Sequence, residues 1–267
     1  MTDSTTPVIL SAVRTPIGRY LGGLAPLPAP RLGALVVRET VRRAGVDPAR
    51  IMDLGIYLII AALVGAKLML VAVDFDYFRT QPRELLSLVR AGGVFYGGLL
   101  GALAVGLWLV RRYDLPVWTT ADLFAPGIAL GHVVGRLGCL LAGCCYGQPT
   151  DAPWGITFTH PVAAANVGTP LGLPLHPTQL YDAGAELIIL AVLLVLERRG
   201  RGFAGRTFWL YMLLYAISRY VVEIYRGDPR GMVWGMSTSQ FVSILIVPLA
   251  LVMLMRLRAR PAVPATA

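Results

Sequence analysis

Residues 131–147 read G-H-V-V-G-R-L-G-C-L-L-A-G-C-C-Y-G, an apolar, glycine-rich stretch that places one arginine, Arg136, inside a segment suited to a lipid bilayer. A cation at membrane depth is costly, so it usually faces a cavity or a partner. Glycines recur every three to five residues and predict a face on which helix backbones approach closely: Gly131, Gly135, Gly138, Gly143 and Gly147. Two interpretations of Arg136 stay open here. It is a seat for an anion such as a lipid phosphate, or it forms a helix-packing ion pair with a carboxylate.

The composition is that of a membrane protein. Of the 267 residues, 56% are hydrophobic and 15% are charged, whereas soluble domains carry about 25% charged residues. The net charge of +9 comes from basic residues in short clusters between apolar runs, which is the positive-inside pattern of membrane proteins rather than a nucleic-acid-binding surface. We expect no nucleic-acid partner. We also expect no cleavable signal peptide, because the first 30 residues hold no continuous apolar core.

Apolar runs long enough to cross a bilayer, which needs about 20 residues, follow Arg50 and predict six transmembrane helices. They lie at about 52–73, 92–110, 120–142, 181–197, 207–225 and 238–255. Arginines cluster before, between and after these runs. If there are six spans, all of these arginines lie on one side of the membrane: Arg42, Arg43, Arg50, Arg111, Arg112, Arg198, Arg199, Arg201, Arg206, Arg256, Arg258 and Arg260. The positive-inside rule then places both termini in the cytoplasm. The predicted fold class is an all-α polytopic membrane protein.

Residues 1–50 differ in character from the rest of the chain. A short strand is expected at 7–13, a Pro/Gly-rich loop to residue 30, and an amphipathic helix over 31–44. This is soluble α/β material that is too short to bury a core of its own. We therefore divide the chain into an N-terminal fragment, a transmembrane domain and a cytoplasmic tail, at 1–50, 51–258 and 259–267.

The predicted topology gathers polar side chains at the membrane side opposite the arginine clusters, which we call the outer side. Arg219, Glu223 and Arg226 share one face of the fifth span because they are spaced i, i+4 and i+7. Arg136 lies in the outer half of the third span, and Tyr96 lies near the outer end of the second. Arg219 and Glu223 could form an intrahelical ion pair only, but several intramembrane charges together favour a functional cavity.

The histidines and cysteines are weaker signals. His132 is four residues before Arg136, and a lone histidine is more often a packed or hydrogen-bonded residue than a catalyst. Zinc sites usually combine two pairs of ligands, whereas the three cysteines offer a single cluster in sequence: Cys139, Cys144 and Cys145. We expect no metal and no cofactor. Packing is the favoured interpretation of Cys139, and the adjacent pair is given no role.

From residue 52 to about 258 the chain resembles the prolipoprotein diacylglyceryl transferases. The motifs that carry the resemblance are G-A-K-L (65–68), G-G-V-F-Y-G-G-L-L-G (92–101), G-R-L-G-C-L-L-A-G-C-C-Y-G (135–147), H-P-T-Q-L-Y-D (176–182), S-R-Y-V-V-E-I-Y-R (218–226) and S-T-S-Q (237–240). Their common order and spacing make the resemblance far more specific than any one motif.

The resemblance implies transfer of a diacylglyceryl group from phosphatidylglycerol to the lipobox cysteine thiol of an exported prolipoprotein, at the outer leaflet of the bacterial cytoplasmic membrane. It implies that Arg136 and Arg219 hold the leaving phosphate, with Glu223 and Arg226 in support. Tyr96, His132 and His176 compete for the proton-transfer role. The implied phospholipid-binding residues are Arg136, Arg219, Arg226, Gly97, Gly98, Cys139, Gly147, Gln179 and Tyr181.

Three departures separate the chain from the family pattern. Tyr96 stands where the family has a histidine, and Cys139 stands where it has an asparagine. The first of seven family helices is missing. In its place V-I-L-S-A-V-R-T-P-I-G-R (8–19), continuing to about residue 48, resembles the N-terminus of thiolases. Two alternatives follow, a non-catalytic phospholipid- or lipoprotein-binding membrane protein and, more remotely, a thiolase-type acyltransferase.

Overall fold

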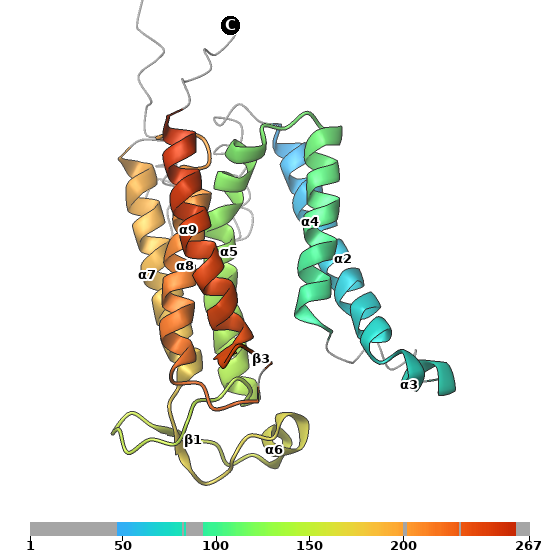
Figure 1. Cartoon of the computed structure of the whole chain (residues 1–267), viewed down its shortest axis with the longest axis vertical. Helices are drawn as coiled ribbons and strands as arrows, with labels where there is room; N and C mark the ends of the chain where they lie inside the picture. The colour runs from blue at the N-terminus through green and yellow to red at the C-terminus, as the bar shows by residue number, and fades with distance from the viewer. Residues whose placement is uncertain (1–46, 82, 84–92, 200–201, 230, 260–267) are drawn as a thin grey trace, which may run out of the picture. The chain divides into compact units, whose positions relative to one another are not determined.

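The computed structural model describes residues 47–81, 83, 93–199, 202–229 and 231–259. The chain divides into two compact units, residues 1–120 and 121–267, and the described residues of each are mainly helical (Figure 1). The strand and helix expected before residue 45, and nearly all of the thiolase-like segment, lie outside the described residues. Their predicted α/β character therefore stays a prediction.

The described part of the first unit contains α2 (Pro48–Val73), α3 (Phe75–Thr80), α4 (Phe95–Arg112) and the first residues of α5 (Val117–Ala142). Asp47 caps α2, since its side chain accepts a hydrogen bond of 2.9 Å from the Ala49 amide. The short α3 lies between the first two predicted spans. The second predicted span corresponds to α4, which begins three residues later than the expected position 92 and ends two residues later than the expected position 110.

Glycines hold α2 and α4 against each other. A Cβ atom added at Gly97 would overlap the Met69 Cβ and the Gly65 carbonyl oxygen, and one added at Gly101 would lie 2.6 Å from the Ala61 carbonyl oxygen. The Val94 amide donates to the Ala66 carbonyl at 3.1 Å, which ties the start of α4 to α2. These glycines therefore serve the close backbone approach typical of packed membrane helices.

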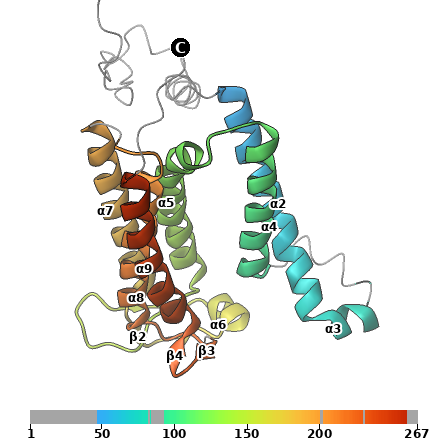
Figure 2. The same cartoon turned by 45° about the horizontal axis from the view of Figure 1, so that its top comes forward.

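The second unit contains α5 (Val117–Ala142, residues 117–120 excepted), α7 (Thr178–Arg198), α8 (Arg206–Glu223) and α9 (Thr238–Arg258). These helices run side by side as a bundle in both views (Figures 1 and 2). All four agree with predicted spans. The S-T-S-Q motif proves to be a capping box that starts α9, in which the Ser237 hydroxyl and the Gln240 side chain each accept from the other residue's amide at 3.2 Å.

Small residues of α5 form the core of this bundle. Ala125 and Ala129 are fully buried against Ile189 and Leu193 of α7 and Tyr211 of α8. Because alanine adds little volume, α5 can approach two helices at once. Asp122 of α5 also caps α8, since its carboxylate accepts from the Gly205 amide at 2.6 Å and from the Phe208 amide at 2.8 Å.

Two loops close one end of the bundle. The loop between α5 and α7 contains β1 (Ile156–Thr157), α6 (Pro161–Val167) and β2 (Pro174–Leu175), with β1 and β2 antiparallel. The loop between α8 and α9 contains the antiparallel pair β3 (Met232–Val233) and β4 (Met236–Ser237). A bridge between Gly147 and Arg226 joins the two loops.

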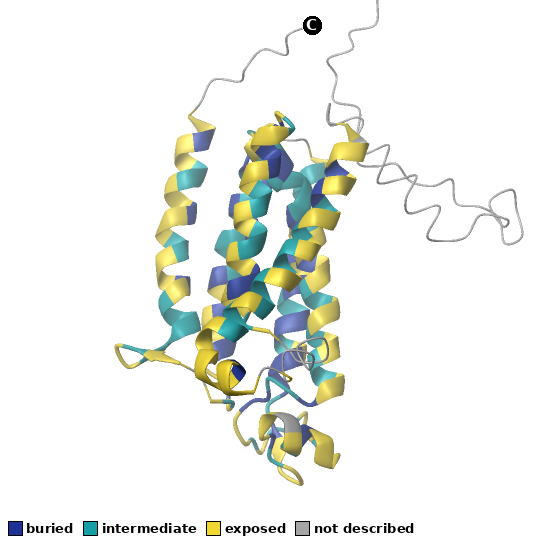
Figure 3. Ribbon diagram, turned by 90° about the vertical axis from the view of Figure 1, so that its right-hand side faces the viewer, coloured by how far each residue is buried: buried dark blue, intermediate teal, exposed yellow. Residues whose placement is uncertain are grey.

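All six predicted spans are helices, and among the described residues four are long and apolar enough to cross a membrane: Ala49–Val73, Val117–Ala142, Thr178–Arg198 and Thr238–Arg258. The other two helices, α4 and α8, have 18 residues each and include charged residues. Exposed residues run along every long helix (Figure 3), and many are large and apolar, such as Leu141 at 90% exposure. Apolar exposed faces suit lipid contact. The count of six spans stays a prediction.

The contact between α2 and α4 gives a first prediction. Gly97→Ala is expected to destabilise the protein by about 1–3 kcal/mol, because the added methyl overlaps backbone and Cβ atoms of α2. Gly127→Ala in α5 is the matched control, since its Cβ would meet no atom within 4 Å. It should leave stability unchanged or raise it by up to about 1 kcal/mol. Thermal unfolding in detergent compares the two, and equal melting temperatures would contradict the close packing.

Candidate functional site

Three arginines converge on one buried carboxylate at the loop end of the second unit. Asp182 lies in the first turns of α7, and its Oδ2 atom is 3.2 Å from Arg136 Nε, 3.7 Å from Arg226 NH1 and 3.9 Å from Arg219 NH1. The arginines come from α5, from α8 and from the residues just after α8. The spans that were expected to meet through their charges therefore do meet within this unit.

Two further carboxylates complete the compensation of charge. Arg219 forms a buried ion pair with Glu223 and donates a 3.2 Å hydrogen bond to Ser239 Oγ. Arg226 donates two hydrogen bonds to Asp228, of 2.8 and 2.9 Å, in the bidentate geometry that suits a guanidinium. The cluster thus pairs three arginines with three carboxylates. Its formal charge is zero, which is the condition for keeping such groups out of water.

Arg136 differs from the other two arginines. Its side chain is 21% exposed, against 7% for Arg219 and 2% for Arg226. Apart from the Asp182 ion pair, it makes no hydrogen bond with any residue in the described part of the chain. The ion-pair interpretation of Arg136 is thus confirmed. The anion-seat interpretation stays a prediction, for which guanidinium donors remain available.

The glycines beside Arg136 border open space. A Cβ atom added at Gly131, Gly135 or Gly138 would meet no atom within 4 Å. Within the second unit no backbone packs against these three positions, so the close helix approach expected along this face stays a prediction. In this unit the glycine strip is uncovered next to the partly exposed arginine.

His132 is held by hydrogen bonds inside the bundle. Its Nδ1 atom lies 2.9 Å from Glu186 Oε1 and 2.9 Å from the Tyr211 hydroxyl, and its ring stacks on Tyr215 with centroids 5.2 Å apart. A carboxylate next to one ring nitrogen orients the imidazole and sets which nitrogen carries the proton. His132 is thus an oriented histidine, and its part in proton transfer stays a prediction.

His176 belongs to an aromatic cluster in the loop region. Its Nδ1 atom lies 3.1 Å from the Tyr181 hydroxyl, which also accepts a 2.8 Å hydrogen bond from the Trp154 indole. The Tyr225 ring packs edge-on at 5.1 Å from the histidine ring. Because this cluster links the loop after α5 to the end of α8, His176 has a structural role whatever its chemistry.

Gly147 and Gln179 fix the loops around the site. A Cβ atom at Gly147 would overlap the His176 carbonyl oxygen and lie 2.9 Å from the Tyr225 carbonyl oxygen. Only glycine fits such an approach of three backbones. Gln179 is fully buried and donates a 2.7 Å hydrogen bond to the Cys144 carbonyl. These contacts give both residues a structural role, and their contact with lipid stays a prediction.

The fold brings the three cysteine thiols together beside the arginines. The Sγ atoms of Cys139, Cys144 and Cys145 all lie within 4.8 Å of one another. Burial and the neighbouring Cys145 and Cys139 thiols raise the pKa of Cys144 to about 12. Burial also acts to raise the pKa of Cys145, but a hydrogen bond from Arg226 and the charges of Arg226 and Arg136 outweigh it and lower that pKa. The packing role expected for Cys139 is thus incomplete, since its thiol joins a cluster.

The remaining predicted site residues belong to the first unit. Tyr96 is 47% exposed on α4, and Gly97 and Gly98 are buried in the contact with α2. That Tyr96 meets the arginines of the second unit stays a prediction, as does lipid binding by the two glycines.

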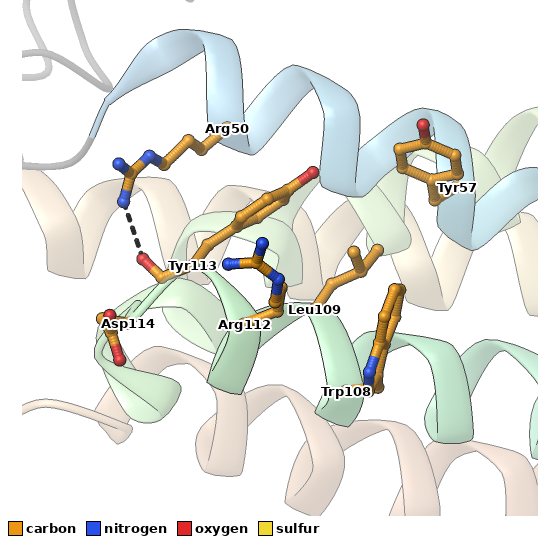
Figure 4. A pocket seen from close by; sticks show the side chains of 7 residues that line it. All are labelled: Arg50, Tyr57, Trp108, Leu109, Arg112, Tyr113 and Asp114. Carbon is orange, nitrogen blue, oxygen red and sulfur yellow. Dashed lines mark hydrogen bonds between the residues drawn. The ribbon is translucent and has the colours of Figure 1, made fainter.

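A cavity of about 570 Å³ also lies in the first unit (Figure 4), lined by Arg50, Tyr57, Trp108, Leu109, Arg112, Tyr113 and Asp114. Arg50 donates a 2.8 Å hydrogen bond to the Tyr113 carbonyl and lies 6.0 Å from the centre of its ring. Arginines with tyrosine and tryptophan are typical of a membrane–water interface. This cavity therefore fits the cytoplasmic boundary predicted for this end of α2 and α4.

Sequence reasoning left two carboxylates out of the site, Glu186 and Asp228, and it placed Asp182 with the polar groups of the outer side without giving it a role. One signal was available, because Glu186 follows Asp182 by four residues and shares its helix face. A helix predicted to span a membrane with two acids on one face points to basic partners on its neighbours. Asp228 offered no such signal, since it lies in a loop.

The chain matches known proteins over most of its length. The profile of the prolipoprotein diacylglyceryl transferase family matches residues 7–256. A phosphatidylglycerol–prolipoprotein diacylglyceryl transferase of Clostridium tetani is 37% identical over 215 residues, which cover 80% of this chain and 83% of that protein. A protein of Clostridium perfringens with that name is 35% identical over 76% of this chain and 77% of its own length. One of Ruegeria pomeroyi is 33% identical over 80% and 79%.

The profile match begins at residue 7 and so includes most of the N-terminal fragment. The match runs through residue 50 without a break, so it does not mark the domain boundary that we predicted there. The resemblance of the first 48 residues to thiolases stays a prediction.

The convergence on Asp182 gives a second prediction. Asp182→Asn should destabilise the protein by about 3–5 kcal/mol, because it removes the charge that compensates three arginines in a buried setting. Asp151→Asn, at an exposed loop aspartate, is the control and should change little. Thermal unfolding in detergent measures both. If Asp182→Asn had the same melting temperature as the wild type, the arginines would not depend on this carboxylate.

Proposed function

The chain belongs to the prolipoprotein diacylglyceryl transferase family, and we propose that it transfers a diacylglyceryl group from phosphatidylglycerol to the lipobox cysteine of a prolipoprotein. It is a transferase of lipoprotein biosynthesis, as the names of its relatives state for those proteins. The observation that carries the choice of substrate is Arg136, a largely buried arginine with unused donors beside an open glycine strip. A phospholipid offers a phosphate to the arginine and acyl chains to the strip.

Arg136 makes the first contact with the lipid phosphate in this proposal. It is the most exposed of the three arginines, and a phosphate oxygen accepts strong charge-assisted hydrogen bonds from a guanidinium. Arg219 lies behind it, held by Glu223 and Ser239. Arg226, held by Asp228, supports the same region of positive charge. Asp182 keeps the arginines together before the lipid binds.

The reaction places new negative charge where these arginines lie. The cysteine sulfur forms a bond to the terminal glyceryl carbon of the diacylglyceryl group, and the bond from that carbon to the phosphate oxygen breaks. Glycerol phosphate leaves with the bonding electron pair, and the thiol proton passes to a base or to water. Guanidinium groups fixed in a water-poor site stabilise this leaving phosphate more in the transition state than in the bound lipid. Tyr96, His132 and His176 remain the candidates for the proton.

The site is proposed to face the outer leaflet of the bacterial cytoplasmic membrane, in a multi-pass protein with both termini in the cytoplasm. Within the second unit, basic residues lie at the helix ends remote from the charged cluster: Arg198 and Arg199 after α7, Arg206 at the start of α8, and Arg256 and Arg258 at the end of α9 (Figure 1). Such residues favour the cytoplasmic side. The opposite end, with its two loops, would then meet exported prolipoproteins and outer-leaflet phospholipid.

The proposed phosphate site gives a third prediction. Arg136→Ala should lower the turnover number by about 10²–10³-fold, because a donor to the developing phosphate charge is lost. Arg136→Lys should retain part of the activity, since it keeps the charge but not the planar fork. Arg199→Ala, an exposed arginine at the other end of α7, is the control and should remain fully active.

The assay uses purified protein, phosphatidylglycerol vesicles and a lipobox peptide, and it follows the gain of one diacylglyceryl unit on the peptide cysteine by mass. Wild-type activity in Arg136→Ala would refute the phosphate site. Saturable phosphatidylglycerol binding by the wild type without any product would favour the alternative of a binding protein, which the tyrosine at position 96 makes worth testing.

A further inference from the structure

We propose that Cys139, Cys144 and Cys145 form a three-thiolate binding site for a zinc ion, with the fourth coordination position open. The site was not expected from the sequence, because no second pair of ligands follows the cysteines. It arises because the chain turns back at the end of α5 and places the adjacent pair against a thiol in the last helical turn.

The geometry of the thiols suits one metal ion. Their Sγ atoms all lie within 4.8 Å of one another. Three sulfurs around one zinc, each at about 2.3 Å from the metal, would be separated by about 3.8 Å. Side-chain rotations that move each Sγ atom by less than about 1 Å would therefore close the site around the ion. The group contains no histidine or carboxylate from the described residues. An all-thiolate donor set favours zinc and other soft metals over magnesium or calcium.

The backbone holds the thiols in place without a metal. Gly143 ends α5 with φ +71°, and Cys145 also has a positive φ of +60°, which is rare for a residue with a side chain. Thr178 and Gln179, both fully buried, donate hydrogen bonds of 2.8 and 2.7 Å to the carbonyls of Cys145 and Cys144. This turn is thus fixed from outside the cluster, as expected of a binding site whose ligands are oriented by their neighbours.

The charges around the thiols favour a thiolate site. Arg226 and Arg136 lie near the Cys145 thiol, and the charges of both act on it. Three thiolates and one zinc ion carry a net charge of −1, and the two nearby guanidinium groups, although paired with carboxylates, still offer this charge a favourable local field. All three cysteines are partly exposed, so an ion can reach them from the loop end of the unit.

The open coordination position could bind the thiol of the substrate, and this part of the inference rests on the proposed function. Zinc sites with three protein ligands keep the fourth for water or substrate, and the proposed substrate reacts through a thiol. A thiol that binds the metal loses its proton to water and remains a nucleophile. Its sulfur would then form the bond to the glyceryl carbon while the carbon–oxygen bond breaks toward the phosphate beside Arg136. No oxidation or reduction is involved.

Metal binding is tested first, without reference to activity. The full-length protein is reduced, freed of metal, loaded with zinc in detergent, and dialysed before its metal content is measured. We expect one zinc per chain. Loading with cobalt(II) should give thiolate charge-transfer absorption. Each of Cys139→Ser, Cys144→Ser and Cys145→Ser should weaken zinc binding by about tenfold or more, while His160→Gln, which removes an imidazole outside the cluster, should bind as the wild type does.

A second measurement on the wild type guards against variants that fail to fold. Zinc should slow the alkylation of all three thiols by N-ethylmaleimide. Four results would each overturn the proposal. The zinc content could equal that of a cysteine-free variant, or zinc could leave the thiols unprotected. The protein could also bind copper(I) but not zinc, or contain a disulfide within the cluster after purification without reductant.

The substrate role has its own readout. A lipobox peptide should shift the absorption of the cobalt-loaded protein, and the same peptide with serine in place of its cysteine should not. An unchanged spectrum with both peptides would remove the substrate role and leave the metal site. Bound zinc without diacylglyceryl transfer would count against the proposed function alone, whereas transfer by a protein that binds no zinc would count against this inference alone.

Discussion

The second unit depends on one carboxylate that compensates several cations in a setting poor in water. Asp182 is the shared ion-pair partner of Arg136, Arg219 and Arg226. Without that charge, the arginines would repel one another with little solvent to screen them. The helices that carry them could then not meet at this end of the bundle. Charge compensation thus holds together the elements that an anionic substrate would have to approach.

At the loop end of α7, most buried residues are polar and the exposed ones are apolar. Buried Thr178, Gln179, Asp182 and Glu186 follow one another along α7, while residues such as Leu187 and Ile188 are exposed on the same helix. In water this arrangement would be unstable, but in lipid the exposed apolar side chains are solvated and the polar ones find partners inside. A phospholipid could therefore move from the bilayer along an apolar surface to reach Arg136.

Backbone hydrogen bonds tie the loops at the end of the bundle to each other and to the helices. Gly147 bridges Arg226, and the Gln148 amide donates to the Tyr225 carbonyl at 2.9 Å. Thr178 and Gln179 hold the carbonyls of the cysteine turn. The arginines and the thiols thus share one framework. A substrate thiol and a leaving phosphate would both find their partners there without a large rearrangement.

The sequence by itself determined the membrane class, the positions of the helices and the gathering of Arg136, Arg219 and Arg226 in one cluster. These follow from the length of apolar runs and from helix periodicity, which are local properties. Only the tertiary structure decided that Asp182 is the common partner, that Gly147 and Arg226 join two loops, and that Cys139 meets Cys144 and Cys145. The reason is physical: contacts across helices depend on rotation about each helix axis and on the path of the loops, and neither is encoded in the spacing of residues along one segment.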